Sequence, residues 1–302
     1  MQVVGFRATV VEVFDDGVGP PAVGAIDGFH RPVPTTAFHV QVDRYLDPAT
    51  VSRQAICLQS AALTVRTIAD CGSGLLLRPS YDPITRTVTY FQEAGSSRLA
   101  PDTFYRLTLV TPTDELDFGL RAFDGAPLAA NYVFDFVTGP DDPAVPTEGP
   151  PDGSLDCRAL LRGPLASCGG GGCHGPGGPP VAMGLDLSSA GGLEATARGH
   201  VAHQTQRGPR ATTGDQSGLT FGRSMPIVAP GDPGRSYLLY KILASSDFAA
   251  DPTLAEGETD RLRAGVVVGM AMPPDPFTVP TPEQLGDLVR WIGAGAPVPS
   301  CP

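Results

Sequence analysis

The sequence predicts two domains of different fold class: an all-β sandwich over residues 1–139 and a mainly α domain with long loops over residues 154–302. Three observations support this division. Apolar and polar residues alternate in the first half, an acidic, proline-rich stretch follows at 140–153, and the pattern of a capped amphipathic helix closes the chain at 281–295. A chain of 302 residues is long enough for two domains that each bury a core.

Four segments of the first domain carry the alternation. Their apolar positions are Phe38, Val40 and Val42; Val88 and Tyr90; Tyr105, Leu107 and Leu109; and Tyr132, Phe134 and Phe136. A period of two bounded by Pro, Gly and Asp is typical of half-buried antiparallel strands. The dipeptide Asp82-Pro83 predicts a turn between LLLRPS and ITRTVTYF. Several short strands at this spacing favour a sandwich.

The first domain also resembles a known family. Residues 30–139 contain FHVQVDRYLDPATV, YDPITRTVTYF, LAPDTFYRLTL and NYVFDFVTG in that order. These segments are similar to the bacterial Ig-like domain of surface-layer and other exported multidomain proteins. The resemblance implies a spacer or adhesive module without catalysis, in which Cys57 and Cys71 form a structural disulfide. A loop of this size would contribute about 3 kcal/mol of stability.

The linker and the second domain differ from the first in composition. The segment PDDPAVPTEGPPDG at 140–153 has no core to bury and is predicted to be extended. Helices are then expected at 154–161, 236–243 and 281–295. In the last, Thr281 is a good N-cap and Gln284 completes a capping box. Four apolar residues form one stripe of this helix: Leu285, Leu288, Val289 and Ile292.

The composition and net charge limit the compartments and the binding partners that are expected for this protein. A formal net charge of −11 argues against a nucleic-acid partner. No run of 18 apolar residues exists, so no transmembrane segment is expected. The first residues have no signal-peptide pattern, which leaves a cytoplasmic protein or one whose lipid or signal anchor was removed or lies upstream. Six cysteines in an even, grouped arrangement favour export to the periplasm or cell surface, although six buried free thiols are the alternative.

The segment SCGGGGCHG at 167–175 is the strongest chemical motif. It has the form C-x4-C-H, a lengthened version of the C-x-x-C-H haem-attachment sequence. Two thiols, Cys168 and Cys173, would add to the two vinyl groups of haem, and His174 would bind the iron. Glycines between the thiols permit the longer loop. We therefore expect one covalent haem c.

The residues leave other interpretations open. Cys168 and Cys173 could instead close a disulfide, with His174 at the surface. A zinc site fits less well, because a fourth ligand is not evident. Cys157 and Cys301 flank the second domain and either form a disulfide that joins its first and last helices or stay unpaired.

The order of further motifs favours haem. GLDLSS, VAPGDPGRSYLLYKIL, GMAMPPDP and WIGAGAP follow the cysteines in that order. Together they resemble the cytochrome-c-like domains of large exported proteins in planctomycetes and related bacteria, over residues 155–298. The resemblance implies a small α-helical haem domain. It also implies that Met272, in M-P-P, is the sixth ligand of the iron.

Other residues compete for the sixth position. They are Met270, Met225, His200 and His203, and Met272 could also be a core residue. A bis-His iron would have a lower reduction potential than a His–Met iron. The segment between GLDLSS and PGDPGR, which contains both histidines, is expected to be a loop or small subdomain at one haem edge.

The sequence therefore predicts an exported monohaem protein for single-electron transfer, carried by an Ig-like spacer. No G-x-S-x-G, P-loop or H-E-x-x-H motif is present, so an electron carrier is favoured over an enzyme. A haem peroxidase would need distal acid or base groups, which only His200 or His203 could supply. The main alternative is a haem-free surface protein, structural or binding, with three disulfides. The redox partner is not identified by the sequence.

Overall fold

The fold is described from a computed structural model of residues 1–302. The structure describes residues 8–14, 22–24, 37–60, 64–71, 75, 77–92, 99–114, 117–140, 157–169, 173–176, 184–202, 224–245, 251–267, 271–274 and 279–298. The chain divides into two compact units. The first comprises Met1–Tyr81 and Thr85–Pro150, and the second comprises Asp82–Ile84 and Pro151–Pro302. The division after Pro150 falls within the segment 140–153 that the sequence marks as a linker.

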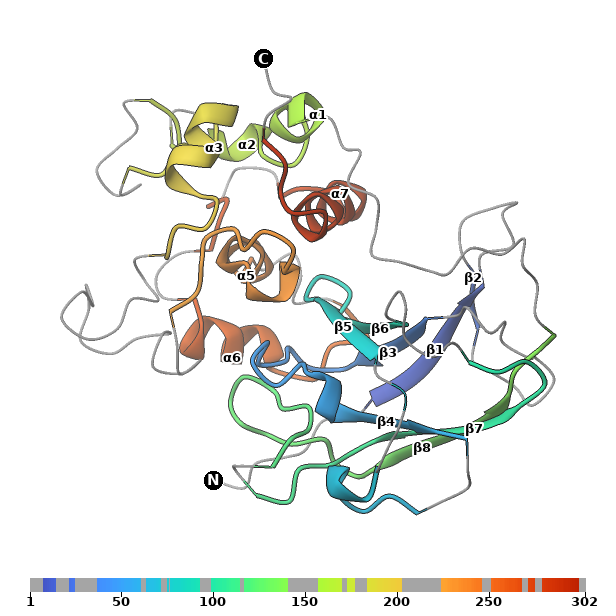
Figure 1. The fold of residues 1–302 in the computed structure, drawn as a ribbon. Coiled ribbons are helices and arrows are strands. Elements are labelled where there is room, and N and C mark those ends of the chain that lie inside the picture. The colour runs from blue at the N-terminus through green and yellow to red at the C-terminus, as the bar shows by residue number, and fades with distance from the viewer. Residues whose placement is uncertain are drawn as a thin grey trace. The chain divides into compact units, whose positions relative to one another are not determined.

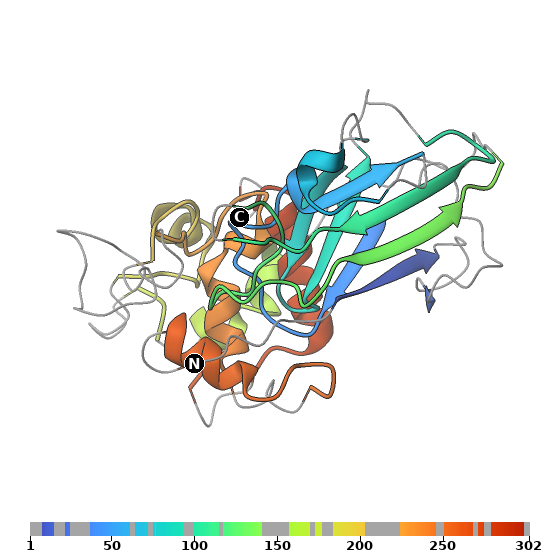
Figure 2. The ribbon, with the colours of Figure 1, turned by 90° about the horizontal axis from the view of Figure 1, so that it is seen from below.

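The first unit contains β-strands in two sheets (Figures 1 and 2). The strands are β1 Ala8–Phe14, β2 Ala22–Gly24, β3 Phe38–Val42, β4 Ile56–Gln59, β5 Leu77–Asp82, β6 Thr87–Gln92, β7 Phe104–Leu109 and β8 Tyr132–Val137. One sheet has the order β2-β1-β3-β6-β5 and the other β4-β7-β8. The strand pairs with a described register are antiparallel, with Val40 opposite Val88 in one sheet and Leu58 opposite Leu107 in the other.

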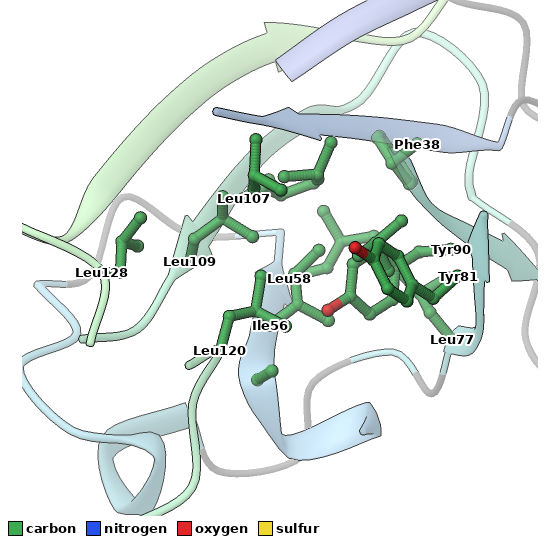
Figure 3. Close-up of a cluster of buried hydrophobic side chains, with 14 of the residues drawn as sticks. Phe38, Ile56, Leu58, Leu77, Tyr81, Tyr90, Leu107, Leu109, Leu120 and Leu128 are labelled. Atoms are coloured by element: carbon green, nitrogen blue, oxygen red, sulfur yellow. The ribbon is translucent and has the colours of Figure 1, made fainter. Parts of the chain in front are cut away.

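A hydrophobic core of described residues joins the two sheets. It contains Phe38 and Tyr90 from the first sheet and Leu107 and Phe136 from the second. The rings of Phe38 and Phe136 lie 5.5 Å apart between centroids. Figure 3 shows the labelled side chains, among them Phe38, Tyr90 and Leu107, gathered between the strands. The architecture of this unit is therefore a β-sandwich, in which the inward residues of each sheet supply the core.

The turn predicted at Asp82-Pro83 connects β5 and β6. The carboxylate of Asp82 accepts a hydrogen bond from the backbone N–H of Ile84 at 2.8 Å, which stabilises the turn locally. Two short 3-10 helices, η1 Arg53–Ala55 and η2 Ile68–Cys71, flank β4 in the sequence. The second of them ends at Cys71, which is bonded to Cys57 of β4 with a Cα–Cα distance of 5.7 Å. This disulfide is the pairing that the Ig-like resemblance implies.

The second unit contains short helices joined by long loops (Figure 1). The helices are α1 Cys157–Arg162, α2 Ala166–Gly169, α3 Ala190–Thr196, α5 Tyr237–Leu243, α6 Glu258–Gly265 and α7 Pro282–Gly293, with a 3-10 turn η6 at Pro233–Arg235. The helix expected at 154–161 begins at Cys157, and residues 154–156 lie outside the described part of the chain. In the part that the structure describes, no helix is both long and apolar enough to cross a membrane.

Helix α7 forms as the sequence predicts. The Thr281 hydroxyl accepts from the backbone N–H of Gln284 at 3.3 Å, and the Gln284 side chain accepts from the Thr281 N–H at 2.9 Å. This is a complete capping box. Leu285 and Leu288 are fully buried, and Trp291 joins them in the core. The Trp291 indole N–H donates to the Pro297 carbonyl at 3.2 Å, so the segment after the helix is held against it.

Candidate haem-attachment site

Cys168 lies on α2, a single helical turn within the core of the second unit. The turn follows Leu165, whose carbonyl accepts from the Cys168 N–H at 3.1 Å. The Cys168 side chain is 5% exposed and packs in the same cluster as Leu187 and Trp291. Burial raises the pKa of the Cys168 thiol, and the neighbouring Cys173 raises it further. The thiol is therefore protonated at neutral pH.

Backbone hydrogen bonds hold His174 between two segments. Its N–H donates to the Cys168 carbonyl at 3.1 Å, and its own carbonyl accepts from the Leu187 N–H at 2.7 Å. The first bond ties His174 to α2, and the second ties it to the segment 184–189. The main chain of His174 is thus fixed directly beside Cys168, although residues 170–172 lie outside the described part.

The segment 184–189, with the sequence GLDLSS, is ordered by its own polar groups. The Asp186 carboxylate accepts from the backbone N–H of Ser188 at 2.9 Å and from its hydroxyl at 2.6 Å. Ser189 then caps α3 by accepting from the Gly192 N–H at 3.0 Å. Leu187 points into the core and is 1% exposed. The segment is therefore a tight turn that leads into the short helix α3.

Glycine at position 169 permits the close approach of this segment to α2. A Cβ atom there would lie 2.7 Å from the Cα of Ser188 and 2.8 Å from the Leu187 carbonyl oxygen. Both are backbone atoms, and such contacts are shorter than a real Cβ tolerates. Gly169 therefore has a packing role as the last residue of α2, in addition to the flexibility that the sequence indicates for the glycines of the motif.

The imidazole of His174 is half-buried and carries one ring nitrogen without a partner. Within the described residues, Nδ1 is buried and makes no hydrogen bond. Burial lowers the pKa of His174, the contact with the Leu185 backbone raises it, and the positive charge of Lys241 lowers it. The net effect is a lowered pKa, so the ring is neutral at pH 7. A neutral imidazole with an uncommitted nitrogen is the form that binds metal.

Both thiols of the motif are free. Cys168 is buried and Cys173 is half-buried, and no disulfide joins them. The interpretation of a disulfide between these two cysteines is thus not the state that the structure describes. Among the described residues, Cys57–Cys71 is the one disulfide. The pairing of Cys157 with Cys301 lies outside the described part, because the side chain of the first and all of the second are not described.

Met272 is joined to α5 by a backbone hydrogen bond. Its N–H donates to the carbonyl of Lys241 on α5 at 3.0 Å. The sequence predicts the helix that carries Lys241, but no pattern in it indicates this contact between α5 and the M-P-P segment.

The other candidate ligands have different environments. Met225 is 5% exposed, and its carbonyl accepts from the Ala202 N–H at 2.9 Å, which joins the segment after α3 to the segment before α5. His200 is exposed, which does not suit a ligand enclosed with the haem. Met270 and His203 lie outside the described residues. The segment between GLDLSS and PGDPGR, expected to be a loop or small subdomain, begins with α3, and its residues 203–223 are also outside the described part.

The side chains fit covalent haem better than a single protein-bound ion. Two free thiols and a neutral imidazole are the groups that c-type attachment requires. In the ranges that the structure describes, no group of three or more His, Cys, Asp or Glu side chains is placed to hold one metal ion. Cys168, Cys173 and His174 would hold the haem, and Met272 is the expected second axial ligand.

Comparisons with known proteins do not assign a family. No protein-family model matches the sequence, and no curated protein matches it. A solved structure with some similarity is the N-terminal part of the bacterial S-layer protein SbsC. It is 15% identical over 44% of this chain, with a TM-score of 0.27, and the chain spans about a quarter (24%) of its length. A likeness of this size carries no argument about fold or function.

Proposed function

We propose that the second unit is a cytochrome-c-like domain that binds one covalent haem for single-electron transfer. The observation that carries the proposal is the state of the C-x4-C-H motif. Its two cysteines are free rather than bonded to each other, and its histidine is held by two backbone hydrogen bonds and left with a buried ring nitrogen that has no partner among the described residues. A surface disulfide with an incidental histidine would require none of these features.

Haem, when bound, would supply a one-electron couple at iron. Cys168 and Cys173 would hold it through thioethers, each formed by addition of the S–H bond across one vinyl group, so that no oxidant is needed. The backbone hydrogen bonds of His174 to Cys168 and Leu187 would fix the imidazole that binds the iron, and the apolar cluster of α2, α5 and α7 lies in the same unit. A methionine at the sixth position, Met272, would favour the reduced iron and a higher potential.

The first unit is proposed to be an Ig-like spacer in an exported protein of the periplasm or cell surface. The Cys57–Cys71 disulfide supports an oxidising compartment, because such bonds are rare in the cytosol. The net charge of −11 favours a protein redox partner over nucleic acid. The partner would receive or supply single electrons, and we propose no substrate conversion.

The test is a pyridine haemochrome spectrum of the full chain, produced together with cytochrome c maturation machinery. We expect a c-type spectrum and haem that stays with the protein on a denaturing gel. Cys168→Ser and Cys173→Ser should each lose one thioether, and the double variant should lose covalent haem. The matched control is the double variant Cys57→Ser with Cys71→Ser, which also removes two cysteines but should retain haem.

Absence of haem from the wild type, with Cys168 and Cys173 disulfide-bonded by mass, would contradict the proposal. It would leave the alternative of a haem-free exported structural or binding protein. Equal haem content in the wild type and in the Cys168/Cys173 double variant would also contradict it, because the haem would then be held elsewhere.

A further inference from the structure

Strand β8 forms one edge of the sheet β4-β7-β8. The Thr138 N–H, just after β8, donates to the Thr103 carbonyl at 3.0 Å, so the even-numbered residues of β8 direct their backbone groups toward β7. Because these groups alternate along an antiparallel strand, Val133, Asp135 and Val137 direct theirs to the outer edge. Among the described residues, no strand is paired with that edge.

The side chains of the same three residues make the outer face of β8 apolar and locally neutral. Val133 is 51% exposed and Val137 is 36% exposed. Asp135 lies between them and pairs with Arg106 of β7 through two hydrogen bonds of 2.6 Å. Soluble proteins usually protect an edge strand with lysine, proline or an unpaired charge, and β8 has none of these. In a chain with a net charge of −11, a neutral patch is a place where a second copy can approach without repulsion.

The inner face of β8 is incompletely covered at the same edge. Phe136 is buried in the core of the sandwich. Phe134 lies on the same face, with its ring 5.7 Å from that of Phe136 between centroids, but it is only partly buried. A strand added beside β8 would cover the Phe134 ring. Strand addition to a sheet edge is a general mode of association, in which main-chain hydrogen bonds give affinity and alternate side chains give specificity.

The sequence of β8 fits a second copy of itself. It reads the same in both directions around Asp135, as V-F-D-F-V. In an antiparallel pair centred on this residue, Val133 lies opposite Val137 of the second copy. Phe134 likewise lies opposite Phe136 of the second copy, and such apolar and aromatic pairs stabilise a sheet. This register also pairs the outward backbone groups of all three exposed residues in each strand.

We propose that the outer edge of β8 is an interface between two copies of this chain, which pair antiparallel about Asp135 into one continuous sheet. A two-fold axis closes the contact, so it gives dimers and not filaments. The two Asp135 carboxylates meet at this axis, and the Arg106 guanidinium of each copy offsets their repulsion. One short strand per copy is small beside the area that stable dimers bury, so the dimer is weak and depends on concentration. The inference does not depend on haem.

The experiment is sedimentation velocity of the full chain over about 5–500 µM protein, a range that covers weak association. A salt concentration of about 0.15 M screens long-range repulsion between the copies. One variant combines Val133→Lys with Val137→Lys, which brings like charges opposite each other in the proposed register. The matched control combines Val133→Glu with Val137→Lys, which brings opposite charges together at the same positions. Circular dichroism establishes that each variant is folded, and a denaturing gel without reductant establishes that no disulfide joins the copies.

A third variant tests the backbone alone. Val133→Pro removes an N–H that points to the outer edge and leaves the hydrogen bonds between β8 and β7 in place. It should weaken the dimer without a new charge.

We expect the mass of the wild type to rise with concentration from 31.3 kDa toward twice that value. The variant with two lysines should stay monomeric, and the Glu/Lys control should still dimerise. A wild type that stays monomeric over the whole range would overturn the inference, as would a two-lysine variant that dimerises like the wild type. A folded Glu/Lys control that is as monomeric as the two-lysine variant would overturn the antiparallel register.

Discussion

Gly192 shows how strictly single residues shape the segment that holds His174. A Cβ atom at this position would lie 2.4 Å from Cγ of Asp186 and 2.8 Å from its carbonyl oxygen. The Asp186 carboxylate cannot move away freely, because it accepts two hydrogen bonds from Ser188. The absence of a side chain at 192 therefore permits α3 to pack on the turn that binds the His174 carbonyl through Leu187.

Gly192→Ala is expected to destabilise the second unit by about 1–3 kcal/mol, because an added methyl group overpacks this contact. The neighbouring Gly191 provides the matched control. A Cβ there meets nothing within 4 Å, so Gly191→Ala should be neutral or stabilising by about 1 kcal/mol through helix propensity. Urea unfolding followed by Trp291 fluorescence measures both. Equal effects of the two substitutions would contradict the packing argument.

The Cys57–Cys71 disulfide is expected to stabilise the first unit. It closes a loop with a sequence separation of 14 and lies in a small apolar cluster with Val65 and Val110. Replacing both cysteines with alanine should cost about 3 kcal/mol of stability in the first unit, because the unfolded chain gains freedom. Denaturant unfolding followed by far-UV circular dichroism measures the loss. Reduction of the disulfide in the wild type should lower its stability by most of the same amount. If reduction left the stability of the wild type unchanged, the disulfide would have no structural role.

Residue identities in the motif could be selected from the sequence, but their surroundings could not. Cys168, Cys173 and His174 are adjacent in the chain and fit a known attachment pattern. The hydrogen bond between the Lys241 carbonyl on α5 and the Met272 N–H joins segments that are distant in the sequence, which no local pattern encodes. Residue type also gave no means of separating Met272 from Met225. The structure distinguishes them by neighbours, since Met272 bonds to Lys241 and Met225 to Ala202.

At the scale of elements, a strand can be predicted from the sequence when only one of its two faces is buried. β3 and β7 each expose one side more than the other, and their alternation marks them as strands. β4 has three consecutive buried residues, Ile56, Cys57 and Leu58, so it shows no alternation and was not predicted. The helices α2 and α3 contain four and seven residues, and both include glycine. Tertiary contacts, rather than intrinsic propensity, therefore stabilise these short helices.

The cap of α7 leads to a prediction at this scale. Thr281→Ala removes the hydroxyl that accepts from Gln284 and should cost about 1 kcal/mol of stability in the second unit. Thr281→Ser keeps a hydroxyl and should cost much less. Chemical unfolding followed by Trp291 fluorescence reports on the helix directly, because that residue lies on α7. A serine variant as unstable as the alanine variant would show that the hydroxyl does not act as a cap.

At the scale of the whole molecule, the described residues include two large hydrophobic cores. One joins the two sheets of the sandwich, and the other gathers residues of α1, α2, α3, α5 and α7. The change along the sequence, from period-two patterns to a capped helix, predicts strands in the first half and helices later, and the structure has this order of elements. The relation of the first unit to a particular β-sandwich family could not be derived in the same way, because many families share this architecture without sequence similarity.

Separate cores predict separate responses to mutation. Leu107 is fully buried in the sandwich, and Leu107→Ala should cost the first unit about 2–5 kcal/mol. The chain has one tryptophan, Trp291, in the second unit, so its fluorescence reports on that unit alone. We expect the substitution to shift the far-UV circular dichroism transition of the strands and to leave the fluorescence transition in place. A matching shift in fluorescence would mean that the two cores unfold together.

The close approach of Ser188 to Gly169, together with the contact of Asp186 with Gly192, has a consequence for evolution. Both contacts restrict which substitutions a lineage can accept, and neither depends on the number of residues between Cys168 and Cys173. Homologues of this chain are therefore expected to keep a glycine directly after the first cysteine, the segment L-D-L-S-S, and a glycine three residues beyond that segment. A search built on that spaced pattern would recover relatives whose cysteine spacing has diverged.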